Sequence, residues 1–395
     1  MTPADRDLCG VCGGAEFEAL HSQGFLLPGE RKTTYLVAAC RACGFAFARD
    51  IPSPEDYEAY YESNRKYTYE GSNNVSSGLK AIHGDSFGMV DGYLAVHSPP
   101  FAGKETRIAD IGCSTGALLS LFKSAGYRQL VGVDPAPECR DIGARLYGVE
   151  IETGPLSRHR PLRPYEVILF SSVLEHLPNP LESIEQASQI LAPGGLLFVQ
   201  VPDADNFGEQ LKEPFLEFSI EHVNYFTITS LTNLMARAGF GPIRQRHDVL
   251  MYSGTAYPAL TSLWQRDESA RERPPARSDL APLRTYIDRC LQKLESIEAA
   301  IDGLIATGQE VVIWGVGSLT SRLLATTRLS EANISRFVDS NTSMHGKTVA
   351  GREIVSPAIL QSGNGTVFIA SYVYGEEIRR TLLEEMNFRG TVISI

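Results

Sequence analysis

Short apolar runs alternate with amphipathic stretches through the middle of the chain. The strand-like runs are rich in Val, Ile and Leu, and the stretches between them place apolar residues at helical spacing. In chain order the segments are 107–111, 117–125, 130–134, 137–147, 166–170, 180–191 and 195–201. This alternation predicts βαβ units, and therefore a parallel sheet with helices on both faces.

The C-terminal part repeats the pattern on a smaller scale. A strand and a glycine-rich turn are expected at 311–318, with further strands at 334–339, 366–370 and 391–395. Ahead of them, apolar residues recur at helical spacing, namely Leu283, Tyr286, Ile287, Cys290, Leu291, Leu294, Ile297, Ile301 and Leu304. We expect a second, smaller α/β unit, joined to the first by a long bridging helix.

With 395 residues the chain exceeds one ordinary core, so several domains are expected. The predicted fold class is α/β, with two Rossmann-like units. The expected domains are an N-terminal metal-binding module at 1–54, a helical and loop lid segment at 55–105, a central Rossmann-like domain at 106–260, a linker with the bridging helix at 261–309, and a C-terminal Rossmann-like domain at 310–395.

Composition and charge narrow the class of partner. Hydrophobic residues make up 43% and charged residues 21%, which is typical of a globular protein. The formal charge of -11 disfavours broad attraction to nucleic acid or anionic lipid. The sequence has neither an apolar stretch of the roughly 20 residues that span a bilayer nor a signal pattern, so we expect a cytoplasmic protein without nucleic-acid or membrane partners.

Four of the seven cysteines form two close pairs. Cys9 with Cys12, and Cys40 with Cys43, are two CxxC hooks that can place four thiolates at the corners of a tetrahedron. We expect structural zinc there, with a hairpin carrying Tyr35 between the hooks; four unmetallated core thiols are the alternative. The leftover thiols, which we expect to be small buried hydrophobes, are Cys113, Cys139 and Cys290.

A tyrosine-rich stretch follows the first module. It runs from residue 57 to 94, includes Tyr67 and Tyr69, and contains a loop predicted at 71–77. A helix is expected to begin near Ser53, because Pro suits the first turn that follows it. A mobile loop ahead of a binding domain can close over a substrate, and a solvated surface linker is the equally weighted alternative.

A glycine turn follows the first central strand. Asp110, Gly112 and Gly116 form the pattern D-x-G-x-x-x-G, in which glycine lets the backbone turn tightly and approach a ligand. The next strand ends at Asp134, where a carboxylate can accept hydrogen bonds from both hydroxyls of a ribose. Together the turn and the acid indicate an adenosine site.

With these motifs, residues 106–202 resemble the class I S-adenosylmethionine-dependent methyltransferases. The resemblance implies that Asp110, Gly112 and Gly116 line the methionine and ribose region and that Asp134 binds the ribose. Leu156 and Ser157 occupy the place of the family's adenine-contacting acid, so adenine recognition stays unassigned.

Two histidines follow the fourth and fifth central strands. His176 lies where a parallel sheet presents its ligands, so it is expected either to face the acceptor or to have a local structural role. His222 follows Glu221, and a histidine with an ordinary pKa near 6.5 can accept a proton at neutral pH. We interpret His222 as a general base, the alternative being a histidine that hydrogen-bonds within its loop.

The complete layout resembles the nucleotide-sugar C-methyltransferases. That resemblance implies catalytic roles for His222, Glu221, His176 and either Tyr67 or Tyr69, with a nucleotide-linked keto sugar as acceptor. A carbonyl acidifies the neighbouring C–H, a base removes the proton, and the resulting enolate attacks the sulfonium methyl group. Ser219 stands where some members of that family carry Tyr.

Other functions remain open on the sequence. An O- or N-methyltransferase acting on another small metabolite or glycan precursor is one, and a zinc-stabilised ligand-binding scaffold is another. The turn at Gly315 and Gly317, with Asp339 after the next strand, would suit a nicotinamide site, but Thr320 replaces the third glycine. We therefore expect the C-terminal domain to be structural and to help enclose the acceptor.

Overall fold

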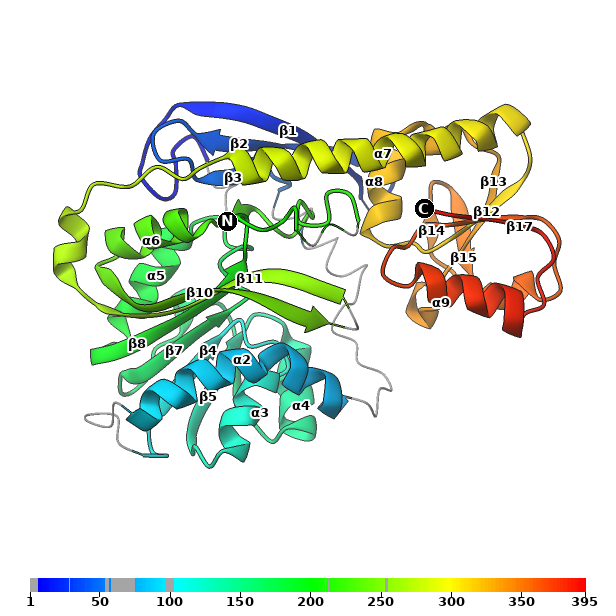
Figure 1. Cartoon of the computed structure of the whole chain (residues 1–395). Coiled ribbons are helices and arrows are strands. Elements are labelled where there is room, and N and C mark those ends of the chain that lie inside the picture. Colours follow the sequence, from blue (N-terminus) through cyan, green and yellow to red (C-terminus); the bar gives the residue numbers. More distant parts are fainter. Residues whose placement is uncertain are drawn as a thin grey trace.

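The computed structural model of the chain describes residues 6–27, 29–53, 57, 75–96, 103–209, 211, 213–252 and 255–395, apart from the side chains of 75–82, 85 and 252. Three β-sheets organise these residues (Figure 1). Within the described ranges, no helix has both the length and the apolarity that are needed to cross a bilayer.

A seven-stranded sheet forms the central unit, with the strand order β10-β11-β8-β7-β4-β5-β6. Its strands are β4 (Arg107–Ile111), β5 (Gln129–Asp134), β6 (Ile151–Thr153), β7 (Tyr165–Ser171), β8 (Leu191–Pro202), β10 (Phe240–Tyr252) and β11 (Thr255–Arg266). Strands β4 to β8 run parallel, and β10 and β11 add an antiparallel hairpin to the β8 edge. The chain order reverses between β4 and β7, and the carboxyl ends of strands at such a point form a crevice for ligands.

Helices cover both faces of this sheet. They are α2 (Val75–Val96), α3 (Ala117–Ser124), α4 (Pro137–Leu146), α5 (Pro180–Gln189) and α6 (Ile228–Arg237). Val167 and Leu169 of β7 share a core cluster with α2 and α3, whereas Ile168 and Phe170 share another with α5 and α6. Because successive side chains of a strand point to opposite faces, β7 is buried on both sides. The predicted α/β class is confirmed.

The N-terminal sheet receives a strand from a distant part of the chain. It contains β1 (Phe17–Leu26), β2 (Lys32–Cys40), β3 (Ala46–Arg49) and β9 (Asn224–Tyr225). The predicted hairpin between the cysteine pairs is present as β1 and β2, and β9 pairs with β3. The segment before β9, which contains His222, therefore lies where the N-terminal sheet meets the central unit.

The C-terminal sheet has the order β14-β15-β13-β12-β16-β17. Its strands are β12 (Val311–Trp314), β13 (Ile334–Val338), β14 (Thr348–Val349), β15 (Arg352–Val355), β16 (Thr366–Ile369) and β17 (Thr391–Ser394), with the helices α8 (Ser318–Thr326) and α9 (Gly375–Arg380). All of its pairings are parallel except that of β14 with β15. Helix α8 packs against β1, so this unit contacts the N-terminal sheet.

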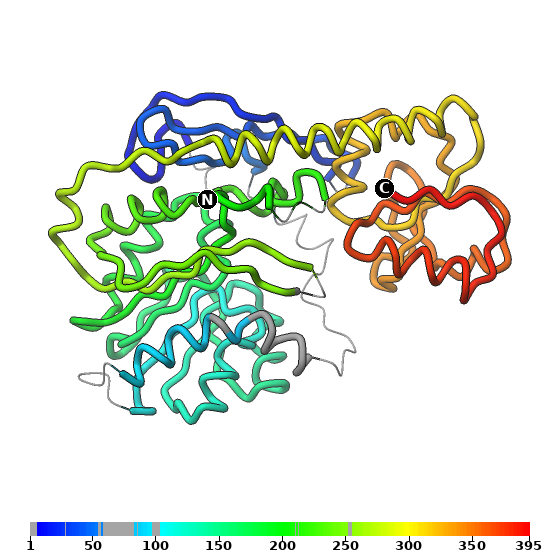
Figure 2. Tube along the Cα trace, viewed as in Figure 1, coloured from blue at the N-terminus to red at the C-terminus, as the bar shows by residue number. Residues whose placement is uncertain are grey.

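The long helix α7 (Ala281–Thr307) extends from the N-terminal sheet to the C-terminal unit, as Figures 1 and 2 show. Leu283 and Tyr286 near its start join the core cluster of the N-terminal sheet, and Ile297 and Ile301 join that of the C-terminal sheet. The helix was predicted from its apolar spacing. Leu291 departs from that prediction, because it is 43% exposed on the outer face.

Three other details differ from the sequence predictions. Ser76 and Ser77 belong to α2 instead of the loop predicted at 71–77, and 71–74 lie outside the described residues. Strand β11 continues past residue 260, so Trp264 is a fully buried sheet residue and not part of a linker. The short strand β6 was not expected. In each case tertiary packing decides the structure over the local composition.

Candidate active site

The glycine turn lies between β4 and α3, at the carboxyl edge of the central sheet. Gly112 and Gly116 have φ angles of 67° and 83°, in the left-handed region that favours glycine. A Cβ atom at Gly112 would lie 2.7 Å from Val173 Cγ2, and one at Gly116 would lie 2.4 Å from Val149 Cγ2. A Cβ at either position would meet the protein's own side chains, so tight packing and the positive φ already require glycine. That the turn approaches a ligand stays a prediction.

Asp134 holds this turn in place. Its Oδ2 accepts a hydrogen bond from the backbone N–H of Ser114 at 2.8 Å, and its Oδ1 accepts one from Ala136 at 2.9 Å. The carboxylate is 8% exposed, and each oxygen keeps further acceptor capacity. This geometry suits the predicted ribose contact, which stays a prediction.

Asp110 lies beneath the same turn at the end of β4. It is 2% exposed, and burial together with the nearby charge of Asp134 raises the pKa of Asp110 to about 8. A cation bound next to this carboxyl would favour its ionised form.

The structure brings His176, Glu221 and His222 together. His176 Nδ1 lies 3.0 Å from the carbonyl oxygen of Glu221, so this ring nitrogen is the donor. The rings of His176 and His222 meet edge to face with their centroids 4.9 Å apart. Glu221 itself is 9% exposed. Nothing in the described residues tests the predicted role of Tyr67 or Tyr69, because both lie outside them.

A fourth group, Glu175, completes this cluster. One of its carboxyl oxygens lies 3.9 Å from His176 Nε2, and the other is buried without a hydrogen-bond partner in the described part of the chain. Burial, with a smaller contribution from Glu217, raises the pKa of Glu175 to about 8. The Glu175 carboxyl is therefore largely neutral at pH 7.

Five consecutive carbonyl oxygens around His222 each accept a hydrogen bond from a side chain. Four donors come from distant parts of the chain and Tyr225 is local: Tyr35 to Ser219 at 2.9 Å, Tyr57 to Ile220 at 3.0 Å, His176 to Glu221 at 3.0 Å, Tyr225 to His222 at 3.0 Å and Arg6 to Val223 at 2.9 Å. Sequence reasoning did not identify Tyr57, Tyr225 or Arg6 as site residues. The irregular segment is thereby fixed without forming a helix or strand.

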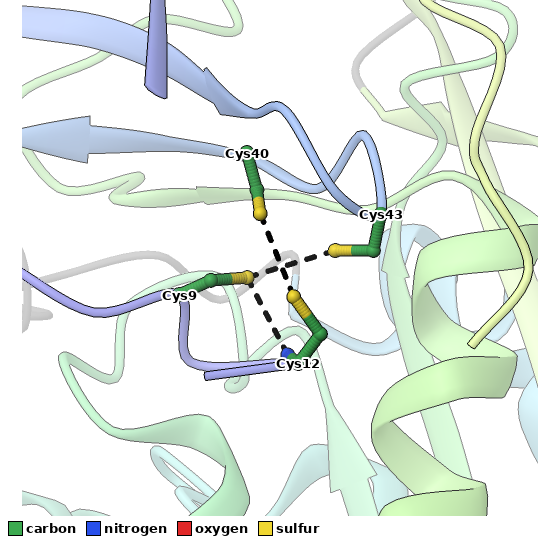
Figure 3. A group of neighbouring side chains, drawn as sticks. All are labelled: Cys9, Cys12, Cys40 and Cys43. Atoms are coloured by element: carbon green, nitrogen blue, oxygen red, sulfur yellow. Dashed lines mark hydrogen bonds between the residues drawn. The ribbon is translucent and has the colours of Figure 1, made fainter. Parts of the chain in front are cut away.

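The four cysteines of the CxxC hooks converge next to the N-terminal sheet (Figure 3). The Sγ atoms of Cys9 and Cys43 are 3.6 Å apart, and those of Cys12 and Cys40 are 3.5 Å apart. Tetrahedral zinc with bonds of about 2.3 Å sets its sulfur ligands about 3.8 Å apart, so the arrangement fits that ion. The remaining three cysteines are buried, as predicted.

The glycine turn of the C-terminal unit has a matching carboxylate. Asp339 Oδ2 accepts a hydrogen bond from Val316 N–H at 3.0 Å, and its Oδ1 accepts one from Asn341 N–H at 2.8 Å. Thr320, in place of the third glycine, donates its hydroxyl to the Gly315 carbonyl at 2.6 Å. Asp339 thus bonds the C-terminal turn as Asp134 bonds the central one. The Thr320 hydroxyl adds a hydrogen bond within the C-terminal turn.

Two family models match parts of the chain. Residues 92–245 match the family described as "Methyltransferase domain", and residues 307–393 match "C2185-like, N-terminal". The chain is 27% identical over 381 residues to the C-methyltransferase NovU of Streptomyces niveus, covering 88% of this chain and 84% of NovU.

Two further similar proteins match a smaller share of the chain. The ubiquinone biosynthesis O-methyltransferase of Vibrio cholerae is 31% identical over 100 residues, which cover 23% of this chain and 40% of that one. The structure of 1,6-didemethyltoxoflavin-N1-methyltransferase from Burkholderia thailandensis has a TM-score of 0.41 at 18% identity, covering 56% of this chain and 96% of that one. The domain match and the NovU alignment identify residues 92–245 as a class I S-adenosylmethionine-dependent methyltransferase domain.

Proposed function

We propose that this methyltransferase adds a methyl group to carbon in a nucleotide-linked keto-deoxysugar. The observation that carries the proposal is the convergence of His176 and His222, with their ring centroids 4.9 Å apart, in a segment that five side chains hold in place. Support also comes from the alignment with NovU, a C-methyltransferase, over most of both chains.

In this proposal His222 accepts a proton from the carbon next to the sugar's carbonyl, which leaves an enolate. S-adenosylmethionine supplies an electrophilic methyl group on a sulfonium sulfur. The enolate carbon forms the new C–C bond, and the electron pair of the broken C–S bond stays on sulfur. His176, whose Nδ1 is bonded to the Glu221 carbonyl, orients the segment that carries His222. Asp110 and Asp134 are the proposed contacts to the cofactor.

We further propose that Cys9, Cys12, Cys40 and Cys43 hold zinc. Their sulfur separations fit tetrahedral coordination. Four sulfur ligands fill the coordination sphere, so the ion stabilises the fold and does not take part in methyl transfer.

The decisive test of carbon methylation is hydrogen exchange. Incubation of the enzyme with S-adenosylhomocysteine and a thymidine-diphosphate-linked 4-keto-6-deoxyhexose in heavy water is expected to introduce deuterium at a carbon next to the carbonyl, as measured by mass spectrometry. The same sugar without enzyme is the control. Methyl transfer to this sugar without any enzyme-dependent exchange would contradict base-assisted enolate formation.

O-methylation is the second candidate, because the Vibrio cholerae relative at 31% identity is an O-methyltransferase. A hydroxyl acceptor contains no exchangeable C–H at the reacting atom. The product of an O-methyltransferase would carry its new methyl group on oxygen, and the enzyme would leave the deuterium content of the carbons unchanged.

The pH dependence of cofactor affinity tests the role of Asp110. Because its pKa is raised to about 8, the free protein holds this carboxyl mostly protonated at pH 6. A cationic cofactor favours the ionised form, so affinity for S-adenosylmethionine should rise between about pH 6 and pH 7.5, by up to about tenfold per pH unit. Calorimetry measures this change.

Two comparisons make the Asp110 prediction specific. Asp110→Asn should bind S-adenosylmethionine more weakly and with a nearly flat pH profile, whereas Asp141→Asn on the exposed side of α4 should retain the wild-type profile. A wild-type affinity that does not change over this pH range would show that Asp110 does not sense the bound cation.

A further inference from the structure

Arg322 links the C-terminal unit to the segment that leads to His222. It lies in α8 and is 2% exposed. Its guanidinium donates hydrogen bonds to the carbonyl oxygens of Pro214 at 2.8 Å and Phe215 at 2.9 Å, and to the Glu213 carboxylate at 3.1 Å. The planar fork of arginine suits several acceptors at once, which a lysine ammonium cannot satisfy in the same geometry.

The turn that Arg322 contacts contains a strained residue, although the Phe218 N–H donates to the Phe215 carbonyl within the turn at 3.0 Å. Phe215 has a φ of 57°, which costs energy for a residue with a bulky side chain. Helix α7 supplies further anchors, since Cys290 Sγ accepts the Phe215 N–H at 3.1 Å and the Tyr286 hydroxyl accepts the Glu217 N–H at 3.1 Å. Helices α7 and α8 therefore add side-chain anchors to the turn's own backbone hydrogen bonds.

A continuous set of packed rings connects the turn to His222. Phe215 and Phe218 stack with their centroids 6.0 Å apart, and Phe218 lies 4.7 Å from the ring of Tyr225. The Tyr225 hydroxyl donates to the His222 carbonyl. A shift of the turn would thus reach the backbone of His222 through groups in direct contact.

We propose that Arg322 is a positioning residue through which the C-terminal unit fixes the His222 segment for catalysis. This inference rests on the proposed role of His222. It gives the C-terminal unit a function in methyl transfer that does not require a ligand of its own. The guanidinium holds residues 213–215 at the start of the His222 segment. The five side-chain donors hold residues 219–223 at its end.

Three variants of the full-length protein test the proposal. Arg322→Lys keeps the positive charge but loses the planar guanidinium that bonds several acceptors at once. Arg322→Met combined with Glu213→Gln removes both charges of the buried ion pair, a change that often preserves folding. Arg328→Met, at a surface arginine with 58% side-chain exposure, is the matched control. Amide hydrogen exchange is measured in the presence of S-adenosylhomocysteine, and kcat with the keto-sugar probe described above.

Both Arg322 variants are expected to exchange the amides of 215–222 about tenfold faster than wild type, with the amides of 107–134 unchanged. Their kcat should fall about 10- to 100-fold while the affinity for S-adenosylmethionine stays within twofold, since small misplacements of a catalytic group have effects of this size. The control should match wild type in every measurement.

Wild-type exchange in 215–222, or a kcat within twofold of wild type, in a folded double variant would overturn the proposal. A general loss of protection throughout the chain would mean that Arg322 serves overall stability, which also overturns it. If the wild-type enzyme leaves the keto sugar unchanged, the proposed function fails instead, and amide exchange in 215–222 still decides whether Arg322 orders the segment.

Discussion

His222→Asn is expected to lower kcat for methyl transfer by about 10²- to 10⁴-fold, the usual contribution of a general base. Asparagine is close to histidine in size and can still form hydrogen bonds, but it does not take a proton from carbon at neutral pH. The affinity for S-adenosylmethionine should stay within about twofold, because His222 lies after β8 and outside the glycine turn of 110–116. Initial rates with the keto-sugar probe and calorimetry measure the two effects.

The same variant should also stop the uptake of deuterium into the sugar. This second measurement matters because it isolates proton removal from the transfer of the methyl group. His345→Asn is a suitable control, since His345 bonds the Asp339 carbonyl in the C-terminal unit. Full methyl transfer by a folded His222→Asn enzyme would remove His222 from the mechanism and leave His176 as the nearest alternative base.

Much of the central fold can be predicted from the sequence, and the reason is physical. Strands buried on both faces, such as β4 and β7, appear as short segments rich in apolar residues, and the predicted strand at 107–111 coincides with β4. By contrast, β6 has only three residues, two of them exposed, and no local pattern marks it. The start of α2 was missed because a sequence rich in Ser and Gly becomes helical when Met89, Val90 and Leu94 pack into the core.

The candidate site also contains some residues that the sequence predicts and others that it does not. His176 and His222 could be identified because each follows a predicted strand, at the edge where parallel sheets bind ligands. The side chains that donate hydrogen bonds to the His222 segment could not be identified from the sequence. Tyr35 and Ser219 are 184 positions apart, and Arg6 and Val223 are 217 positions apart. Contacts between side chains and an irregular backbone leave no periodicity in the sequence, so only the folded chain reveals them.

Loss of the metal from the four-cysteine cluster is the other large expected effect. Cys40→Ser should abolish tight zinc binding and lower the melting temperature by about 10 °C, which corresponds to a loss of several kcal/mol in a protein of this size. Activity should fall further than cofactor affinity, because Tyr35 and Arg6, which lie in the same N-terminal module, donate to the carbonyls of Ser219 and Val223. Metal analysis by mass spectrometry, thermal denaturation and kcat together test this coupling.

Cys139→Ser separates the metal effect from the loss of a buried thiol. Cys139 is fully buried in α4 and lies outside the cluster, so this variant should keep its zinc and most of its activity. Treatment of the wild-type protein with a chelator should reproduce the Cys40→Ser phenotype, and added zinc should reverse it. If chelated and zinc-loaded protein melt at the same temperature and turn over equally fast, the four thiols do not need an ion to hold the N-terminal sheet against the His222 segment.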